Sequence, residues 1–314
     1  MAAKTSLVEP WPKAKALRPG DSVAVIAPSG PVPAGRLAAG LAALESRYHV
    51  EKTEGLLHQR GFLAGEDGRR LAELRWALSD PQVRAVFCAR GGHGVLRLLS
   101  SLLAAQSDEL PLRPLVGFSD ITVLHALLAR HRRVTIHGPV VTQLGELPDS
   151  DRAALWALLE SPQPPPPLSG LVNLSVSARS VTGRLLGGNL EVLSRLCGTP
   201  LADSLLHSGP VVLLIEEVTE APYRIDRALT HLRHAGALDR VVAAVVGDLT
   251  RCEGPAEHPS ALEVVSERLS GLGVPVLAGV PLGHGERNRA VPLGVAVHID
   301  PRRGCVEFLD SVVD

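Results

Sequence analysis

The sequence is poor in aromatic residues, in net charge and in long hydrophobic runs, and each shortage excludes a class of protein. Phe, Tyr and Trp make up 3% of the 314 residues, which argues against base stacking on nucleic acid. A formal net charge of −1 gives no electrostatic case for nucleic acid or an anionic membrane. No run reaches the ~18 apolar residues of a membrane span, and the N-terminus lacks the apolar core of a signal peptide. We therefore predict a cytoplasmic protein with neither nucleic acid nor membrane as partner.

Cysteine is also scarce, and its four positions are far apart: Cys88, Cys197, Cys252 and Cys305. They form no C-x-x-C pair, so the sequence predicts no disulfide framework and no zinc site or other metal. The loop after the first apolar strand, Pro28-Ser-Gly-Pro31, lacks G-x-G-x-x-G and with it a dinucleotide fingerprint.

The length and the pattern of apolar runs predict two domains of the α/β class. The chain exceeds the usual ceiling of about 250–300 residues for one domain. In the first half, strands alternate with helices, which is the signature of a parallel sheet covered on both faces. A stiff proline tract at 161–167 follows. We predict an N-terminal α/β domain over 1–160, a linker over 161–180 and a β-rich α+β domain over 181–314, in which 291–299 is one continuous apolar run.

Ligands of parallel sheets collect at the carboxyl ends of the strands, and a glycine-rich loop, Arg90-Gly-Gly-His-Gly94, stands at one such end. Its backbone N–H groups could approach a phosphate or an oxyanion closely, although no Walker lysine accompanies them. The alternative is a tight turn that needs positive φ, for which one glycine would suffice.

A second strand end carries Ser119, between the apolar run Leu115 to Phe118 and a helical pattern that begins at Ile121. A serine at a sharp turn from strand to helix can present its hydroxyl above the sheet as a nucleophile. It can equally be an ordinary helix N-cap. The nucleophile-elbow pattern G-x-S-x-G is not met, because Ile121 occupies the place of the second glycine.

Acids and histidines at other strand ends offer partners for Ser119. The apolar strand from Val211 ends in Glu216 and Glu217, either of which could orient a histidine or simply be solvated. His284 lies between two glycines after the run 274–280 and is the best candidate for a general base. His93 and His137 compete with it, since both lie in strand-end loops of the first domain. The order Ser, Glu, His and a cleft between the domains would suit a hydrolase.

Taken together, these stretches resemble the LD-carboxypeptidase family of serine peptidases, which includes the microcin C immunity peptidases. The matching segments cover nearly the whole chain in the family's order: 23–30, 89–94, Gly117-Phe-Ser-Asp-Ile-Thr122, 136–139, Gly183-Arg-Leu-Leu-Gly-Gly-Asn-Leu190, 215–227 and Gly283-His284.

The resemblance implies a Ser-His-Glu triad on Ser119, His284 and Glu216, with Glu216 chosen over Glu217 by the family's pattern. It implies an oxyanion hole from the backbone N–H groups of Gly92 and Asp120. It also implies a homodimer without cofactors, built from a flavodoxin- or glutamine-amidotransferase-like first domain and a β-rich second one.

The activity that the resemblance implies is removal of terminal D-alanine from murein tetrapeptide, at an L,D-peptide bond, in cell-wall recycling. His93 replaces a tyrosine that is usual in the family, so we expect it to contact substrate. The microcin-immunity branch cleaves peptidyl-nucleotide amides with the same machinery and stays an alternative, although scarce aromatics favour murein peptide. A non-catalytic module that binds an anion in the glycine-rich loop is the other alternative. An amidotransferase would need cysteine where Ser119 stands.

Overall fold

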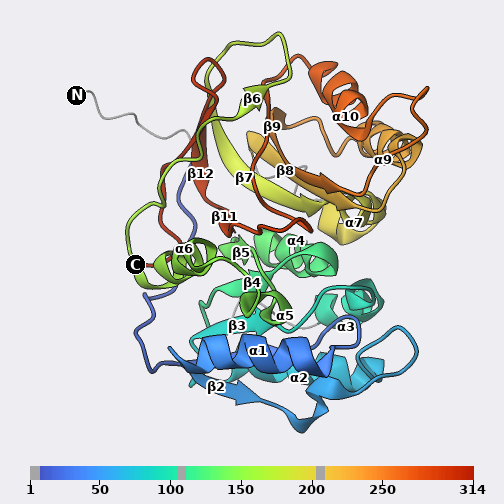
Figure 1. Cartoon of the computed structure of the whole chain (residues 1–314). Coiled ribbons are helices and arrows are strands. Elements are labelled where there is room, and N and C mark those ends of the chain that lie inside the picture. Colours follow the sequence, from blue (N-terminus) through green and yellow to red (C-terminus); the bar gives the residue numbers. More distant parts are fainter. Residues whose placement is uncertain (1–7, 105–110, 203–208) are drawn as a thin grey trace.

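The computed structural model describes residues 8–104, 111–202 and 209–314. Their strands form two sheets, and α4 (Thr122–Arg130) lies between them (Figure 1). The first sheet has six strands in the order β11-β5-β4-β3-β1-β2. Five are parallel and one, β11, runs antiparallel on β5. Their bounds are β1 (Ser22–Ile26), β2 (His49–Lys52), β3 (Ala85–Cys88), β4 (Leu115–Gly117), β5 (Thr135–His137) and β11 (Val291–Leu293).

The helices of the first half arise from the apolar spacing that the sequence shows. In α2 (Asp67–Ser79), the buried residues Glu73, Leu74, Ala77 and Leu78 recur at helical spacing, and Asp80-Pro81 ends the helix. The other helices of this half are α1 (Ala34–Glu45), α3 (Leu99–Leu103), α5 (Val141–Leu144) and α6 (Asp149–Glu160), and single 3₁₀ turns cover Glu54–Leu57, Val95–Leu98 and Ser119–Ile121.

The second sheet has seven strands in the order β13-β12-β7-β8-β9-β10-β6. Its centre is parallel, from β7 to β10, and antiparallel strands close both edges. The strands are β6 (Val172–Asn173), β7 (Val181–Asn189), β8 (Val211–Val218), β9 (Val241–Thr250), β10 (Val276–Ala278), β12 (Ala296–Asp300) and β13 (Cys305–Phe308). The remaining elements are α7 (Leu190–Arg195), a 3₁₀ turn at Pro200–Ala202, α9 (Pro222–His234) and α10 (Ala261–Ser270).

The predicted fold class, a parallel-sheet α/β half followed by a β-rich α+β half, is confirmed. One expectation is wrong: the apolar run 291–299 is two strands in different sheets, β11 and β12. Gly294 separates them with a φ of +91°, and a Cβ there would lie 2.6 Å from the Trp11 ring. Only glycine therefore fits this crossing between the sheets.

The chain also ties its halves together outside the sheets. The Arg184 guanidinium lies 4.3 Å from the centre of the Trp11 ring, and Ala14 forms a parallel bridge with Val313. Just after Ala14 in the chain, Ala16 and Leu17 donate backbone hydrogen bonds to Asp314 and to Leu159 of α6. The C-terminus therefore lies beside α6 (Figure 1). β6 falls within the range predicted as a linker, 161–180, and pairs with β10. The predicted boundary between the two domains stays a prediction. Among the described residues, no helix is long and apolar enough to cross a membrane.

Candidate active site

Ser119 lies at the carboxyl end of β4, where the chain turns sharply into α4. Its φ is +64°, in the left-handed region that side chains rarely adopt. Such a conformation costs on the order of 1–3 kcal/mol and is typical of functional turns. Phe118 is the N-cap of the 3₁₀ turn Ser119–Ile121 and Ile121 is the N-cap of α4, and neither position has a side-chain cap bond. The helix-cap alternative is therefore wrong, and the backbone has the shape of a nucleophile elbow without its second glycine.

The glycine-rich loop after β3 packs directly on this serine. A Cβ on Gly91 would lie 2.8 Å from the Ser119 Cβ and 3.1 Å from its Oγ. A Cβ on Gly92, whose φ is +115°, would lie 3.1 Å from the Cα of Gly30. Both glycines thus allow backbone to approach closely, and the Gly92 N–H has no hydrogen-bond partner among the described residues. The loop thus packs closely on the serine and carries a free N–H donor one residue from Gly91.

Asp120 uses its side chain to fasten three strand-end loops together. Its buried Oδ2 accepts hydrogen bonds from the Ser29 hydroxyl at 2.5 Å and from the Val95 backbone N–H at 3.0 Å. The carboxylate is therefore occupied in holding the turn. The backbone N–H of Asp120 is the group for which the family resemblance implies a place in an oxyanion hole, and that role stays a prediction.

The second sheet brings a histidine and a carboxylate together. Glu216, near the end of β8, is fully buried, and His284 follows β10 in a partly exposed loop. The His284 Nδ1 and Glu216 Oε2 atoms are 2.8 Å apart in a hydrogen bond. The His284 ring also packs on Phe118, with centroids 4.6 Å apart. His284 thus lies against the residue before Ser119, although no hydrogen bond joins His284 to Ser119 among the described residues.

Glu217 serves a different purpose from its neighbour. Its carboxylate accepts hydrogen bonds from the Asn189 side chain at 3.0 Å and from the backbone N–H of Glu191 and Val218, each at 2.8 Å. Burial raises the pKa of Glu217 to about 7. Because successive residues of a strand point to opposite faces, Glu217 caps α7 while Glu216 faces His284.

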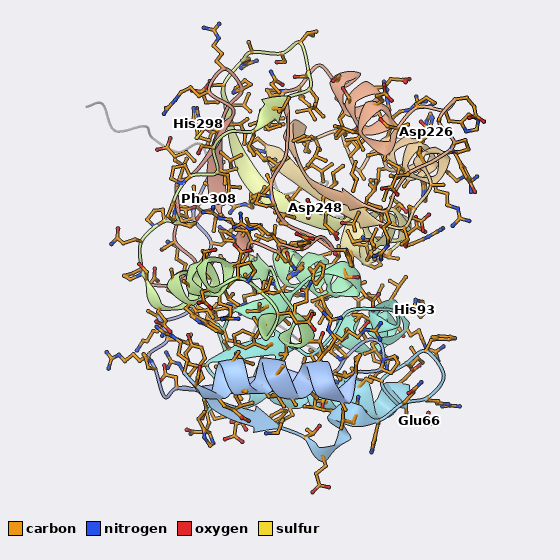
Figure 2. All side chains as sticks on the ribbon, in the orientation of Figure 1. Glu66, His93, Asp226, Asp248, His298 and Phe308 are labelled. Atoms are coloured by element: carbon orange, nitrogen blue, oxygen red, sulfur yellow. The ribbon has the colours of Figure 1, made fainter. Side chains whose placement is uncertain are left out.

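The two competing histidines are placed differently. His137 is fully buried against Phe118 at 5.9 Å, and both ring nitrogens lack partners among the described residues. Burial lowers the pKa of His137 well below its usual value, so this ring stays neutral. His93 is exposed on the first-sheet half (Figure 2) and packs edge-on against Phe62 at 5.4 Å. Of the three histidines, His284 is the one bonded to a carboxylate.

Contacts at the junction of the halves explain the Gly187-Gly188-Asn189 motif. A Cβ on Gly188 would collide with the Thr122 hydroxyl, which accepts a hydrogen bond from the Asn189 N–H at 3.0 Å. The end of β7 therefore rests on the start of α4, three residues after Ser119. No local pattern explains this motif, because its partner Thr122 is 67 residues away in the chain.

Asp248 is a residue near the site that sequence reasoning missed. It lies at the end of the apolar part of β9, on the second half (Figure 2), and its charge interacts with Glu216 and His284. The signal was available, since an acid ends an apolar run there as Glu216 does in β8. In the described part of the chain, no group of three or more His, Cys, Asp or Glu residues could hold a metal ion.

Family models match both halves of the chain. Residues 23–138 match the LD-carboxypeptidase N-terminal domain, and residues 182–299 match the LD-carboxypeptidase C-terminal domain. The chain belongs to the LD-carboxypeptidase family. The resemblance that the sequence motifs indicated is thereby confirmed, and with it membership of a family of carboxypeptidases.

Curated relatives extend over nearly the whole of this LD-carboxypeptidase chain. It is 33% identical to a probable murein peptide carboxypeptidase of Bacillus subtilis, over 90% of this chain and 89% of the relative. It is 32% identical to the murein tetrapeptide carboxypeptidase of Pseudomonas aeruginosa, over 90% and 94%.

Solved structures agree with the fold. A muramoyltetrapeptide carboxypeptidase from Oxalobacter formigenes superposes with a TM-score of 0.77 at 28% identity, over 91% of this chain and 97% of that one. The microcin C7 self-immunity protein in complex with aspartyl sulfamoyl adenosine gives a TM-score of 0.84, over 96% and 100%. At 20% identity this second likeness shows the fold alone.

Proposed function

We propose that this LD-carboxypeptidase is a serine peptidase that hydrolyses an L,D-peptide bond and releases the terminal D-alanine of murein tetrapeptide. Ser119 is the nucleophile, His284 the general base and Glu216 the residue that orients it. The observation that carries the proposal is the strained turn of Ser119, whose neighbour Phe118 packs against an imidazole that is bonded to a buried carboxylate. The named murein peptidases among the relatives support the substrate class.

The reaction follows from the chemistry of these groups. The free Nε2 of His284 takes the Ser119 proton while Oγ attacks the carbonyl of the scissile bond. The developing oxyanion accepts hydrogen bonds from the backbone N–H groups of Gly92 and Asp120. The protonated His284 then donates its proton to the amine of the departing D-alanine. Water, deprotonated by His284, hydrolyses the acyl-enzyme and restores the serine.

Glu216 keeps Nδ1 of His284 protonated and offsets the positive charge that the ring acquires. His93 contacts the substrate from the glycine-rich loop, and its contact with Phe62 places an exposed aromatic pair beside that position. As in the family, we propose that the protein acts in the cytoplasm as a homodimer without a cofactor.

The test is incubation of the purified protein with L-Ala-D-Glu-meso-diaminopimelate-D-Ala, with D-alanine release followed by mass spectrometry. We expect release by the wild type and a loss of about 10⁴-fold or more in kcat with Ser119→Ala, by analogy with triad knockouts. Near-normal turnover by Ser119→Ala would contradict the assignment of the nucleophile.

A peptidyl-nucleotide amide, assayed in parallel, separates the alternative substrate class. Cleavage of that compound without release of D-alanine would contradict murein peptide as the substrate. An anion-binding module would show ligand-dependent thermal stabilisation that Ser119→Ala leaves unchanged, and no product from either compound.

A further inference from the structure

We infer that Asp248 is a positioning residue that holds the His284 loop from both sides of the histidine, an inference that rests on the proposed role of His284 as general base. Asp248 belongs to β9, whereas His284 lies in the loop after β10. The two strands are parallel neighbours in the second sheet. The end of one strand thus supports the loop that leaves the next.

The first contact lies before the histidine. The backbone N–H of Asp248 donates a hydrogen bond to the carbonyl of Leu282 at 2.9 Å. Asp248 therefore extends the pairing of β9 beyond β10 and fixes the chain two residues ahead of His284. Leu282 is fully buried, so this side of the loop has little freedom to move.

The second contact lies after the histidine. The Gly285 backbone lies directly against the Asp248 carboxylate. A Cβ on Gly285 would lie 2.5 Å from the Asp248 Oδ2, so only glycine allows this approach. The Asp248 main chain and side chain together hold the residues on either side of His284.

Gly283 shows the same close packing toward the other carboxylate. Its φ is +128°, and a Cβ there would lie 3.0 Å from the Glu216 Oε2 and 3.4 Å from the Asp248 Cβ. The two glycines that flank His284 therefore each face a carboxylate. Asn288 adds a third support, since its Oδ1 accepts from the Gly283 N–H at 3.1 Å and its Nδ2 donates to Gln143 of the first half at 3.0 Å.

The charge of Asp248 also bears on His284. Burial and the nearby charge of Glu216 raise the pKa of Asp248, while the Gly285 N–H and the charge of His284 act to lower it. The titratable groups that interact with the imidazole are thus Glu216, Asp248 and the neutral His137 behind Phe118. A positioning role and a purely electrostatic role can be separated, because asparagine keeps a side-chain oxygen for the Gly285 N–H and loses the charge.

The experiment compares Asp248→Ala with Asp248→Asn on the tetrapeptide, with His284→Ala measured alongside. A misplaced catalytic group can cost about 10²-fold in rate. We expect Asp248→Ala to lower kcat by about 10- to 100-fold with KM changed by less than about 3-fold. Asp248→Asn should restore kcat to within about 5-fold of the wild type, because it retains a side-chain oxygen that faces the Gly285 N–H.

Two results would overturn the inference. Unchanged kcat in Asp248→Ala would mean that the contact does not position the base. An equal loss in both variants, with the acid-limb pKa of kcat/KM lowered, would mean that charge and not position is responsible. Asp226→Ala is the matched control, because Asp226 pairs with Arg268 on the outer helices and its loss should leave kcat unchanged. If His284→Ala stays active, it is the proposed function that fails.

A second pair of variants guards against loss of folding. Gly285→Ala pushes a methyl group against the Asp248 carboxylate, so it should lower kcat in the wild type and much less in Asp248→Ala. Additive effects would contradict the contact. The NMR signal of the His284 Nδ1 proton needs no substrate. It should broaden in Asp248→Ala and persist in Asp248→Asn, and an unchanged signal in Asp248→Ala would count against the inference.

Discussion

Ser119 and His284 approach the junction from opposite halves of the molecule, and each half holds its residue by a different means. In the first-sheet half, Ser119 is fixed by a strained backbone turn between β4 and α4. The titratable groups behind it, His125 and His137, are buried and neutral, since burial lowers the pKa of both. The strained conformation of the proposed nucleophile is thus local, and the contacts of Ser29 and Val95 with Asp120 hold the turn in place.

The second-sheet half holds His284 through carboxylates that are remote in the chain. Glu216 is 68 residues away from the histidine that it binds, and Asp248 belongs to a different strand again. This half has no comparable strained turn at the histidine. The comparison shows that a strained local turn can present the proposed nucleophile. The proposed base, in contrast, is oriented by partners that the fold brings together from remote parts of the chain. The following changes test that contrast, in order of expected effect.

The largest effect in the second half should come from Glu216→Gln. Its amide could hold the His284 ring in the wrong tautomer, and the comparable change in serine proteases costs about 10⁴-fold in kcat. We expect a loss of roughly 10²–10⁴-fold in kcat/KM on the tetrapeptide. Glu217→Gln is the matched control, since Glu217 caps α7 and does not contact His284. Equal losses of kcat/KM in the two variants would contradict the separate roles of Glu216 and Glu217 that the geometry indicates.

The two halves should also respond to pH with opposite signs. Burial lowers the pKa of His125 to about 4, so below its usual value of about 6.5 the unfolded chain binds a proton that the folded chain does not. Stability is therefore lost as pH falls from about 6.5 to about 4, by on the order of 3 kcal/mol. The urea concentration at the midpoint of unfolding should be lower at pH 4.5 than at pH 7. This difference should be smaller in His125→Asn than in the wild type.

Glu217 acts in the other direction. Its pKa is raised to about 7, so between about 4.5 and 7 the folded chain keeps a proton that the unfolded chain releases. Its contribution to stability is full below about pH 4.5 and is lost as pH rises through 7, by roughly 1–3 kcal/mol. Glu217→Gln should thus flatten the dependence between pH 5 and 8. If the free energy of unfolding of Glu217→Gln declined more steeply than that of the wild type in this range, or equally steeply, the contrast between the halves would be contradicted.

The smallest effect is the release of backbone strain at Ser119, the proposed nucleophile. Ser119→Gly removes the side chain from a residue with φ of +64° and should raise the free energy of unfolding by about 1 kcal/mol while abolishing turnover. Ser119→Ala keeps the strain and should be no more stable than the wild type. Thermal unfolding of the three proteins at one pH is sufficient. Equal melting temperatures for the glycine and alanine variants would argue against stored strain.

Several features followed from sequence because they depend on neighbours in the chain. One such feature is α2, which the apolar spacing of its residues and the Asp80-Pro81 stop define locally. Prediction of a continuous run over 291–299 was wrong because two sheets competed for it, and the position of Gly294 beside Trp11 is visible only in three dimensions. The contacts of Asp248 with the His284 loop could not be predicted for the same reason, because they join residues that are remote in the chain.

The sequence by itself determined that Ser119 meets the glycine-rich loop. Both follow parallel strands, β3 and β4, and the carboxyl ends of adjacent parallel strands lie at one edge of a sheet. Only the tertiary structure decided which histidine and which acid join them. Glu216 and Glu217 are alike in sequence, and His93, His137 and His284 all follow strands. Strand alternation and the packing of one half on the other turn Glu216 toward His284, bury His137 and leave His93 exposed. Those choices depend on contacts between residues far apart in the chain, which no local pattern encodes.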